Sequence, residues 1–128
     1  MLAETDFLVL TAPHTPETEN MIGARELALM KPTAVLINIA RGTLVDEEAM
    51  IRALQEKKLA GAALDVFRQE PPPQDSPLWA MPNVIISPHS ASTVRQENER
   101  ITALFCDNLG RFLRGVPLRN VLDVEKLY

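Results

Sequence analysis

The sequence contains few glycines, few histidines and a single cysteine, and each shortage excludes a class of site. No two of its 5 glycines stand one residue apart, so the 128 residues contain no G-x-G-x-x-G loop of the kind that binds a pyrophosphate. Cys106 has no second cysteine with which to form an internal disulfide. With only 2 histidines as well, a cysteine- or histidine-based metal site is not expected.

The chain also lacks an excess of positive charge and a long apolar run. Its net charge is −4, so we expect neither nucleic acid nor an anionic membrane as a partner. No apolar run reaches the roughly 18 residues of a transmembrane helix, and Glu4 and Asp6 argue against a signal peptide. With 46% hydrophobic residues, the composition predicts a soluble, cytoplasmic α/β domain without an internal boundary.

Apolar runs alternate with helical patterns along the chain. The predicted strands are residues 7–10, 34–39, 62–67 and 84–86, and the predicted helices are 24–30, about 47–58 and 92–114. The first run, Phe7-Leu8-Val9-Leu10, is typical of a strand buried on both faces. Asp46 is suited to cap the second helix. This alternation predicts right-handed βαβ units in a parallel sheet.

The longest predicted helix has one apolar face. Its members recur at helical spacing and are Val94, Ile101, Phe105, Leu109 and Phe112. We expect Cys106, beside this face, to serve packing. We expect Trp79 to cover one end of the core, or else to contribute to a subunit interface.

Three polar residues each follow a predicted strand. Arg41 comes after the second strand, Glu70 after the third and His89 after the fourth. Parallel strands end at one edge of a sheet, where ligands of such folds bind, so we expect the three to converge. The guanidinium can hold a carboxylate, and the imidazole can exchange a proton near neutral pH. Such a set suits the reduction of a 2-oxo acid.

Four segments resemble motifs of the D-isomer-specific 2-hydroxyacid dehydrogenases. The first is Asn38-Ile39-Ala40-Arg41-Gly42-Thr43-Leu44-Val45-Asp46-Glu47, similar to the family's N-x-A-R-G-x-x-V-D-E stretch. The others are Asp65-Val66-Phe67 with Glu70-Pro71, Ser87-Pro88-His89-Ser90-Ala91, and Met30-Lys31-Pro32. They occur in the family's order and cover nearly the whole chain.

The resemblance implies a role for each matching residue. His89 would donate and accept the proton, Glu70 would be its carboxylate partner, and Arg41 would bind the substrate's carboxylate and carbonyl. Asp65 would contact the nicotinamide carboxamide. The expected cofactor is NAD or NADP, and the residues expected to line its site are Ala12, Pro13, Ile39, Ala40, Arg41, Asp65, His89, Ala91 and Ser92. A small 2-oxo or 2-hydroxy acid substrate and a homodimer are implied as well.

The chain departs from the family pattern at the phosphate loop and the substrate domain, for which it has no matching segment. We therefore expect a Rossmann-like half domain, the C-terminal portion of a dinucleotide-binding domain. Its helix and tail, about 92–128, would pack toward a substrate domain, and the isolated chain would be inactive. One alternative is a non-catalytic, cofactor-sensing corepressor on the same fold. A flavodoxin-like signalling domain would need acidic residues after the first strand, where Thr11-Ala12-Pro13 offers none.

Overall fold

The computed structural model describes residues 1–125 and divides into two compact units, Met1–Ala91 and Ser92–Tyr128. The sequence predicted one domain without an internal boundary, although the second unit begins where the helix and tail of about 92–128 were expected to begin. The strands of the first unit are β1 (Phe7–Leu10), β2 (Val35–Asn38), β3 (Gly61–Leu64) and β4 (Val84–Ile86). Its helices are α1 (Ala24–Leu29) and α2 (Glu47–Gln55), with 3₁₀ turns at Leu2–Glu4, Gly42–Leu44 and Pro77–Ala80.

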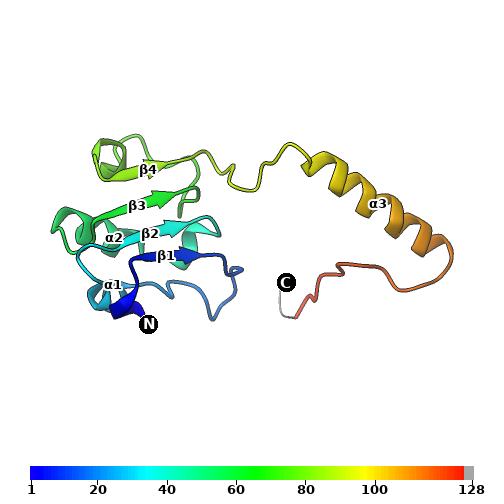
Figure 1. The fold of residues 1–128 in the computed structure, drawn as a ribbon, viewed down its shortest axis with the longest axis horizontal. Helices are drawn as coiled ribbons and strands as arrows, with labels where there is room; N and C mark the ends of the chain where they lie inside the picture. Colours follow the sequence, from blue (N-terminus) through cyan, green and yellow to red (C-terminus); the bar gives the residue numbers. More distant parts are fainter. Residues whose placement is uncertain (126–128) are drawn as a thin grey trace. The chain divides into compact units, whose positions relative to one another are not determined.

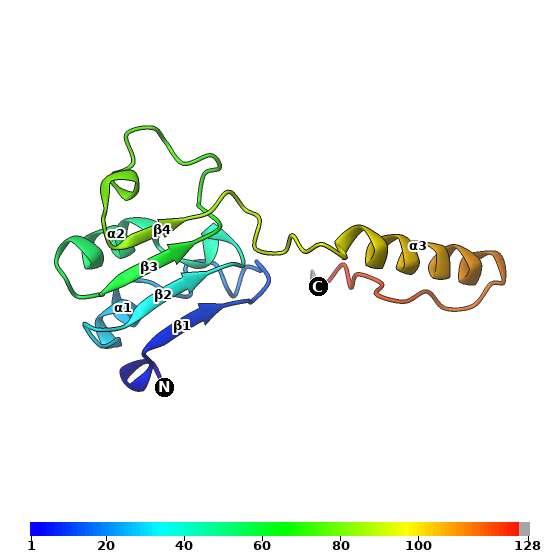
Figure 2. The same ribbon diagram turned by 45° about the horizontal axis from the view of Figure 1, so that its top comes forward.

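The four strands form one parallel sheet in the order β1-β2-β3-β4, which confirms the predicted α/β class (Figure 1). Leu10 pairs with Asn38, and Asn38 with Leu64, so the strands end nearly level. All four arrows point the same way in Figure 2. The loops that follow the strands therefore leave from one edge of the sheet, as the sequence predicted.

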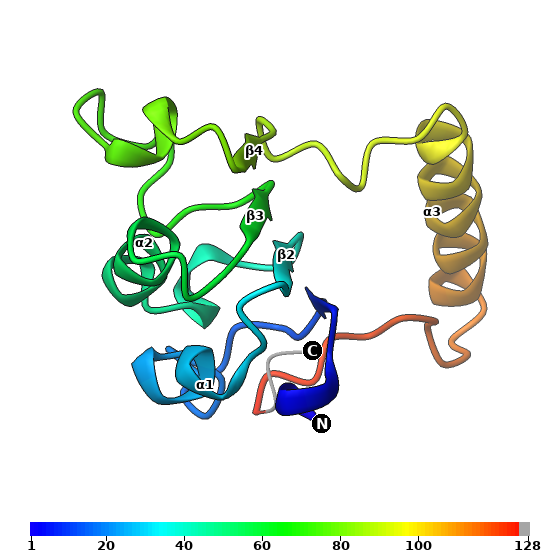
Figure 3. The ribbon, with the colours of Figure 1, turned by 60° about the vertical axis from the view of Figure 1, so that its left-hand side comes forward.

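Both helices of the first unit lie on one face of its sheet (Figure 3). The core between these helices and the sheet includes the fully buried Leu36, Leu44, Leu59 and Leu78. The prediction that β1 is buried on both faces is wrong: Phe7 is 66% exposed and Val9 48% exposed. These two side chains alternate with Leu8 and Leu10, which pack in or against the core. Apolar residues thus occupy both faces of β1, while the unit's helices cover only one.

Helix α2 begins where the sequence predicted and ends earlier. Asp46 accepts a hydrogen bond at Oδ1 from the Ala49 amide at 3.0 Å, which confirms it as the N-cap. The helix ends at Gln55 because Lys57 adopts a left-handed conformation, with φ of 56°. The predicted continuation to about Lys58 is therefore wrong.

The second unit consists of α3 (Glu97–Leu113) and a tail that returns along it. Asn108 exchanges two hydrogen bonds with the backbone of Arg119, at 2.8 and 3.0 Å. The helix begins five residues later than predicted, so Val94 precedes it. The apolar face of α3 is exposed at Ile101, Phe105, Leu109 and Phe112. Cys106 is exposed too, so it does not pack within this unit, and its expected packing role stays a prediction.

Within the described residues, no helix is both long enough and apolar enough to cross a membrane.

Candidate active site

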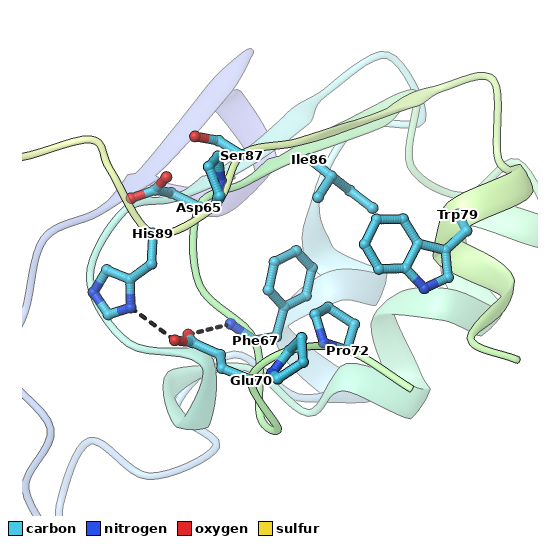
Figure 4. A pocket seen from close by; sticks show the side chains of 10 residues that line it. Asp65, Phe67, Glu70, Pro72, Trp79, Ile86, Ser87 and His89 are labelled. Carbon is cyan, nitrogen blue, oxygen red and sulfur yellow. Dashed lines mark hydrogen bonds and ion pairs between the residues drawn. The ribbon is translucent and has the colours of Figure 1, made fainter. Parts of the chain in front are cut away.

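His89 and Glu70 form a direct pair at the carboxyl edge of the sheet. The Nδ1 atom of His89 lies 2.8 Å from Oε2 of Glu70 (Figure 4). Glu70 comes from the loop after β3 and His89 from the loop after β4, 19 residues apart in sequence. Both side chains are partly exposed, at 37% and 48%. The structure therefore brings together two of the three predicted catalytic residues, with one imidazole nitrogen engaged and the ring still accessible.

The Glu70 carboxylate is fixed from a second direction. Its Oε1 accepts a hydrogen bond from the Phe67 amide at 2.9 Å. The hydrogen bond with His89, this amide and the nearby charges of His89 and Arg41 outweigh partial burial, and together they lower the pKa of Glu70. Glu70 is consequently an anion at neutral pH, and its Oε2 lies within hydrogen-bond distance of the His89 Nδ1 atom.

Asp65 is a buried carboxylate, 4% exposed, directly after β3. Its Oδ1 accepts from the Ser90 amide and its Oδ2 from the Ala91 amide, both at 2.8 Å. Burial raises the pKa of Asp65, but hydrogen bonds from Ser87, Ala91 and Ser90, with the charge of His89, lower it overall. Asp65 is thus ionised and bound to the turn that carries His89.

Arg41 is held by a turn that Asn38 organises. The Asn38 Nδ2 donates to the Arg41 carbonyl at 2.9 Å, and the Ala40 amide donates to Asn38 Oδ1 at 3.1 Å. The Arg41 guanidinium donates to the Ala40 carbonyl at 2.6 Å, and its charge contributes to the lowered pKa of Glu70. Arg41 therefore lies within electrostatic reach of the pair.

Several predicted cofactor residues line a hollow of about 120 Å³ along the strand ends. Its lining consists of Ile37, Ile39, Ala63, Leu64, Asp65, Ile85, Ser87 and Ala91. Among the other predicted residues, Ala40 is buried, and Ala12 packs against the core after β1. The Pro13 carbonyl accepts a hydrogen bond from the Thr18 hydroxyl at 2.8 Å. Ser92 begins the second unit, and its place at the cofactor site stays a prediction.

A larger hollow, of about 380 Å³, lies on the Glu70 side of the pair. Figure 4 shows Phe67, Pro72, Trp79 and Ile86 around it. Trp79 is 51% exposed, and its Nε1 donates to the Pro73 carbonyl at 2.8 Å. The prediction that Trp79 covers the core is therefore wrong. Asp65 and Ser87 line both hollows, so the two adjoin.

Asn38, Phe67 and Gly42 were given no catalytic or cofactor-binding role from the sequence, yet they support the loops that carry the site. A Cβ atom on Gly42 would overlap the backbone carbonyl of Phe67, so only glycine lets the loops after β2 and β3 approach this closely. Only Asn38 could have been found from the sequence, because it is a polar residue at the end of an apolar strand. It is 1% exposed, and a buried side-chain amide needs hydrogen-bond partners. Among the described residues, no group of three or more His, Cys, Asp or Glu is placed to hold a metal ion.

Relatives of known sequence resemble nearly all of this chain. It is 46% identical over 127 residues to a glyoxylate/hydroxypyruvate reductase B of Pectobacterium carotovorum, covering 99% of this chain and 40% of the relative. It is 44% identical over 125 residues to a glyoxylate reductase of Korarchaeum cryptofilum, covering 98% and 38%. The chain therefore spans about two fifths of the length of these relatives.

Solved structures show the same fold. A D-isomer specific 2-hydroxyacid dehydrogenase of Xanthobacter autotrophicus, in complex with NADPH and MES, matches with a TM-score of 0.92 and 41% identity. That match covers 99% of this chain and 52% of the other. An NADPH-dependent glyoxylate/hydroxypyruvate reductase of Sinorhizobium meliloti, in complex with NADP and sulfate, matches with a TM-score of 0.90 and 34% identity, covering 99% and 41%. These matches confirm the predicted Rossmann-like class.

The family model for the NAD binding domain of the D-isomer specific 2-hydroxyacid dehydrogenases matches residues 1–91, which are the whole of the first unit. The four motifs, the parallel sheet and the relatives agree with this match, and the chain belongs to the D-isomer specific 2-hydroxyacid dehydrogenase family.

Proposed function

We propose that this chain supplies the acid–base part of an oxidoreductase that interconverts a 2-oxo acid and a D-2-hydroxy acid with NAD or NADP. The observation that carries the proposal is the 2.8 Å contact between His89 Nδ1 and Glu70 Oε2. A carboxylate on Nδ1 fixes the imidazole and leaves Nε2 as the nitrogen that exchanges a proton with substrate. The names of the relatives favour glyoxylate and hydroxypyruvate as the first substrates to test.

When bound, NADH or NADPH would supply the hydride chemistry that reduces the carbonyl of the 2-oxo acid. His89 donates its Nε2 proton to the carbonyl oxygen, so that the alkoxide is neutralised as it forms. Glu70 stabilises the imidazolium before this transfer. Arg41 holds the substrate carboxylate through paired hydrogen bonds. In the reverse direction, neutral His89 accepts the hydroxyl proton.

The residues at the strand ends fit the nicotinamide end of such a cofactor. The smaller hollow offers an apolar floor with one buried carboxylate, Asp65, at its edge. This pairing suits a flat ring that carries a carboxamide. The sequence contains no closely spaced glycines to hold the pyrophosphate. We therefore propose that residues 1–128 alone bind the cofactor weakly and are inactive.

We extend the proposal to the whole protein. Residues 92–128 would pack toward a substrate domain, and the exposed apolar side chains of α3 support this placement. We also propose a homodimer, which the family resemblance supports, and a cytoplasmic location, which the composition supports, and the net charge of −4 argues against a nucleic acid partner. Light scattering of the complete protein tests the homodimer.

A hybrid enzyme tests the proposed reaction. This chain would replace the segment that it matches in the Pectobacterium reductase, and reduction of glyoxylate and hydroxypyruvate would be followed through NADPH absorbance. We expect His89→Ala to remove most of kcat, and Arg41→Ala mainly to raise KM for the 2-oxo acid. Lys58→Ala, which removes only an exposed ion pair with Glu56, is the matched control. Near-normal turnover of His89→Ala across pH would overturn the assignment.

A further inference from the structure

The Asp65 carboxylate is bound to the loop that carries His89, although the family resemblance assigns Asp65 only to the cofactor. Asp65 begins the loop after β3, while the amides that it binds, those of Ser90 and Ala91, belong to the loop after β4. The two hydrogen bonds span 25 and 26 residues of sequence. One buried side chain thus joins the two loops on which Glu70 and His89 lie.

The conformation of His89 needs such a restraint. Its φ is 53°, in the left-handed region that side-chain-bearing residues seldom adopt. A residue there persists when the surrounding structure fixes it. The two amides that directly follow His89 both donate to Asp65, and the Ser87 amide ahead of it donates to the Leu64 carbonyl at 2.9 Å. The turn is therefore fixed to the end of β3 on both sides of His89.

Asp65 is itself held in place by the backbone of the sheet. The Asp65 amide donates to the Asn38 carbonyl at 3.0 Å, which continues the sheet beyond β3. Asp65 is 4% exposed, so its charge is stabilised mainly by the hydrogen bonds that it accepts from the two amides, and only slightly by water. Its oxygens cannot change partners without leaving a buried polar group unsatisfied.

We propose that Asp65 is a positioning residue: by accepting hydrogen bonds from the Ser90 and Ala91 amides, it holds His89 in contact with Glu70. The role of that contact in catalysis rests on the proposed function, whereas the geometry can be tested without turnover. A merely structural Asp65 would affect the stability of the unit and leave the contact between His89 and Glu70 intact whenever the unit is folded.

The test is Asp65→Asn in the 128-residue chain, followed by NMR. Asparagine keeps the size of the side chain but presents an NH₂ group to one of the two amide donors. We expect the pKa of Glu70, measured from its carboxyl ¹³C shift, to rise toward its usual value as His89 moves away. We also expect loss of the ¹H signal of the hydrogen-bonded His89 Nδ1 proton. Both signals unchanged in a folded Asp65→Asn chain would overturn the proposal.

Asp46→Asn is the matched control, because Asp46 also accepts a backbone amide, that of Ala49, away from the pair. It should leave the pKa of Glu70 unchanged, and an equal rise there would show a general loss of stability and overturn the proposal.

A second variant decides the question if Asp65→Asn does not fold. Replacing Ala91 by lactic acid exchanges its amide N–H for an ester oxygen and leaves the Asp65 charge in place. A raised Glu70 pKa in this ester supports the proposal, and an unchanged value contradicts it. Failure of the hybrid enzyme to reduce 2-oxo acids would refute the proposed function without changing either NMR result.

Discussion

The backbone amide of Asp65 donates to the carbonyl of Asn38 at 3.0 Å, so the two buried polar residues at the ends of β3 and β2 are neighbours. Each uses its side chain to hold a loop that carries a candidate catalytic residue. Asn38 binds the backbone of Ala40 and Arg41, and Asp65 binds the two amides after His89. Buried polar side chains at the ends of the two central strands therefore hold the loops that form the site.

Replacement of Gly42 should destabilise the first unit. A Cβ at this position would overlap the Phe67 backbone, which cannot yield as a flexible side chain would. We expect Gly42→Ala to lower the free energy of unfolding by about 1–3 kcal/mol or more, measured by urea denaturation. Gly23→Ala is the control, since its Cβ would meet Glu26 Oε2 at an ordinary 3.5 Å. Equal effects of the two changes would refute the steric explanation.

Loss of the α2 cap should have a smaller effect. Asp46→Ala leaves the Ala49 amide without its side-chain acceptor, and we expect a loss of about 1 kcal/mol in the free energy of unfolding. Asp46→Asn should change it by only a few tenths, since asparagine caps helices about equally well. A stability loss as large in Asp46→Asn would show that the charge, and not the hydrogen bond, matters.

The Glu70 pair should make stability depend on pH in the acid range. The pKa of Glu70 is lower in the folded chain than its usual value of 4.5, so its contribution is fully present above pH 4.5. It is lost as the pH falls through the folded-state pKa. We expect Glu70→Gln to reduce the acid dependence of the free energy of unfolding between pH 5 and 3, without removing the part due to Asp65, whose pKa is also lowered. An unchanged pH profile would count against the pair in solution.

The isolated chain should bind nicotinamide cofactors weakly or not at all. It has residues suited to the nicotinamide end and lacks closely spaced glycines for the pyrophosphate. Titration of NADH fluorescence with the 128-residue chain measures this directly. Micromolar affinity would contradict the expectation and would require another phosphate site in these residues.

The sequence predicted the parallel sheet and the convergence of the loops after its strands at one edge, because periodicity and parallel topology determine which residues meet there. The pairing of Glu70 with His89 was implied by the family resemblance, and the structure places the two in contact. The sequence could not predict that β1 exposes Phe7 and Val9, because an apolar run looks the same whether one face or both are covered. Trp79 was misplaced for a similar reason: an aromatic side chain can pack in a core or line a hollow. The roles of Asn38 and Gly42 depend on contacts between loops, which no local pattern encodes.

Glu70, His89 and the carboxylate that anchors their loops all belong to the first unit, which ends at Ala91. The contact between Glu70 and His89, the proposed proton donor, is therefore complete within a single unit. Because both side chains and Asp65 belong to that unit, a change in what packs against it would alter the exposure of the imidazole and leave its contact with the carboxylate in place.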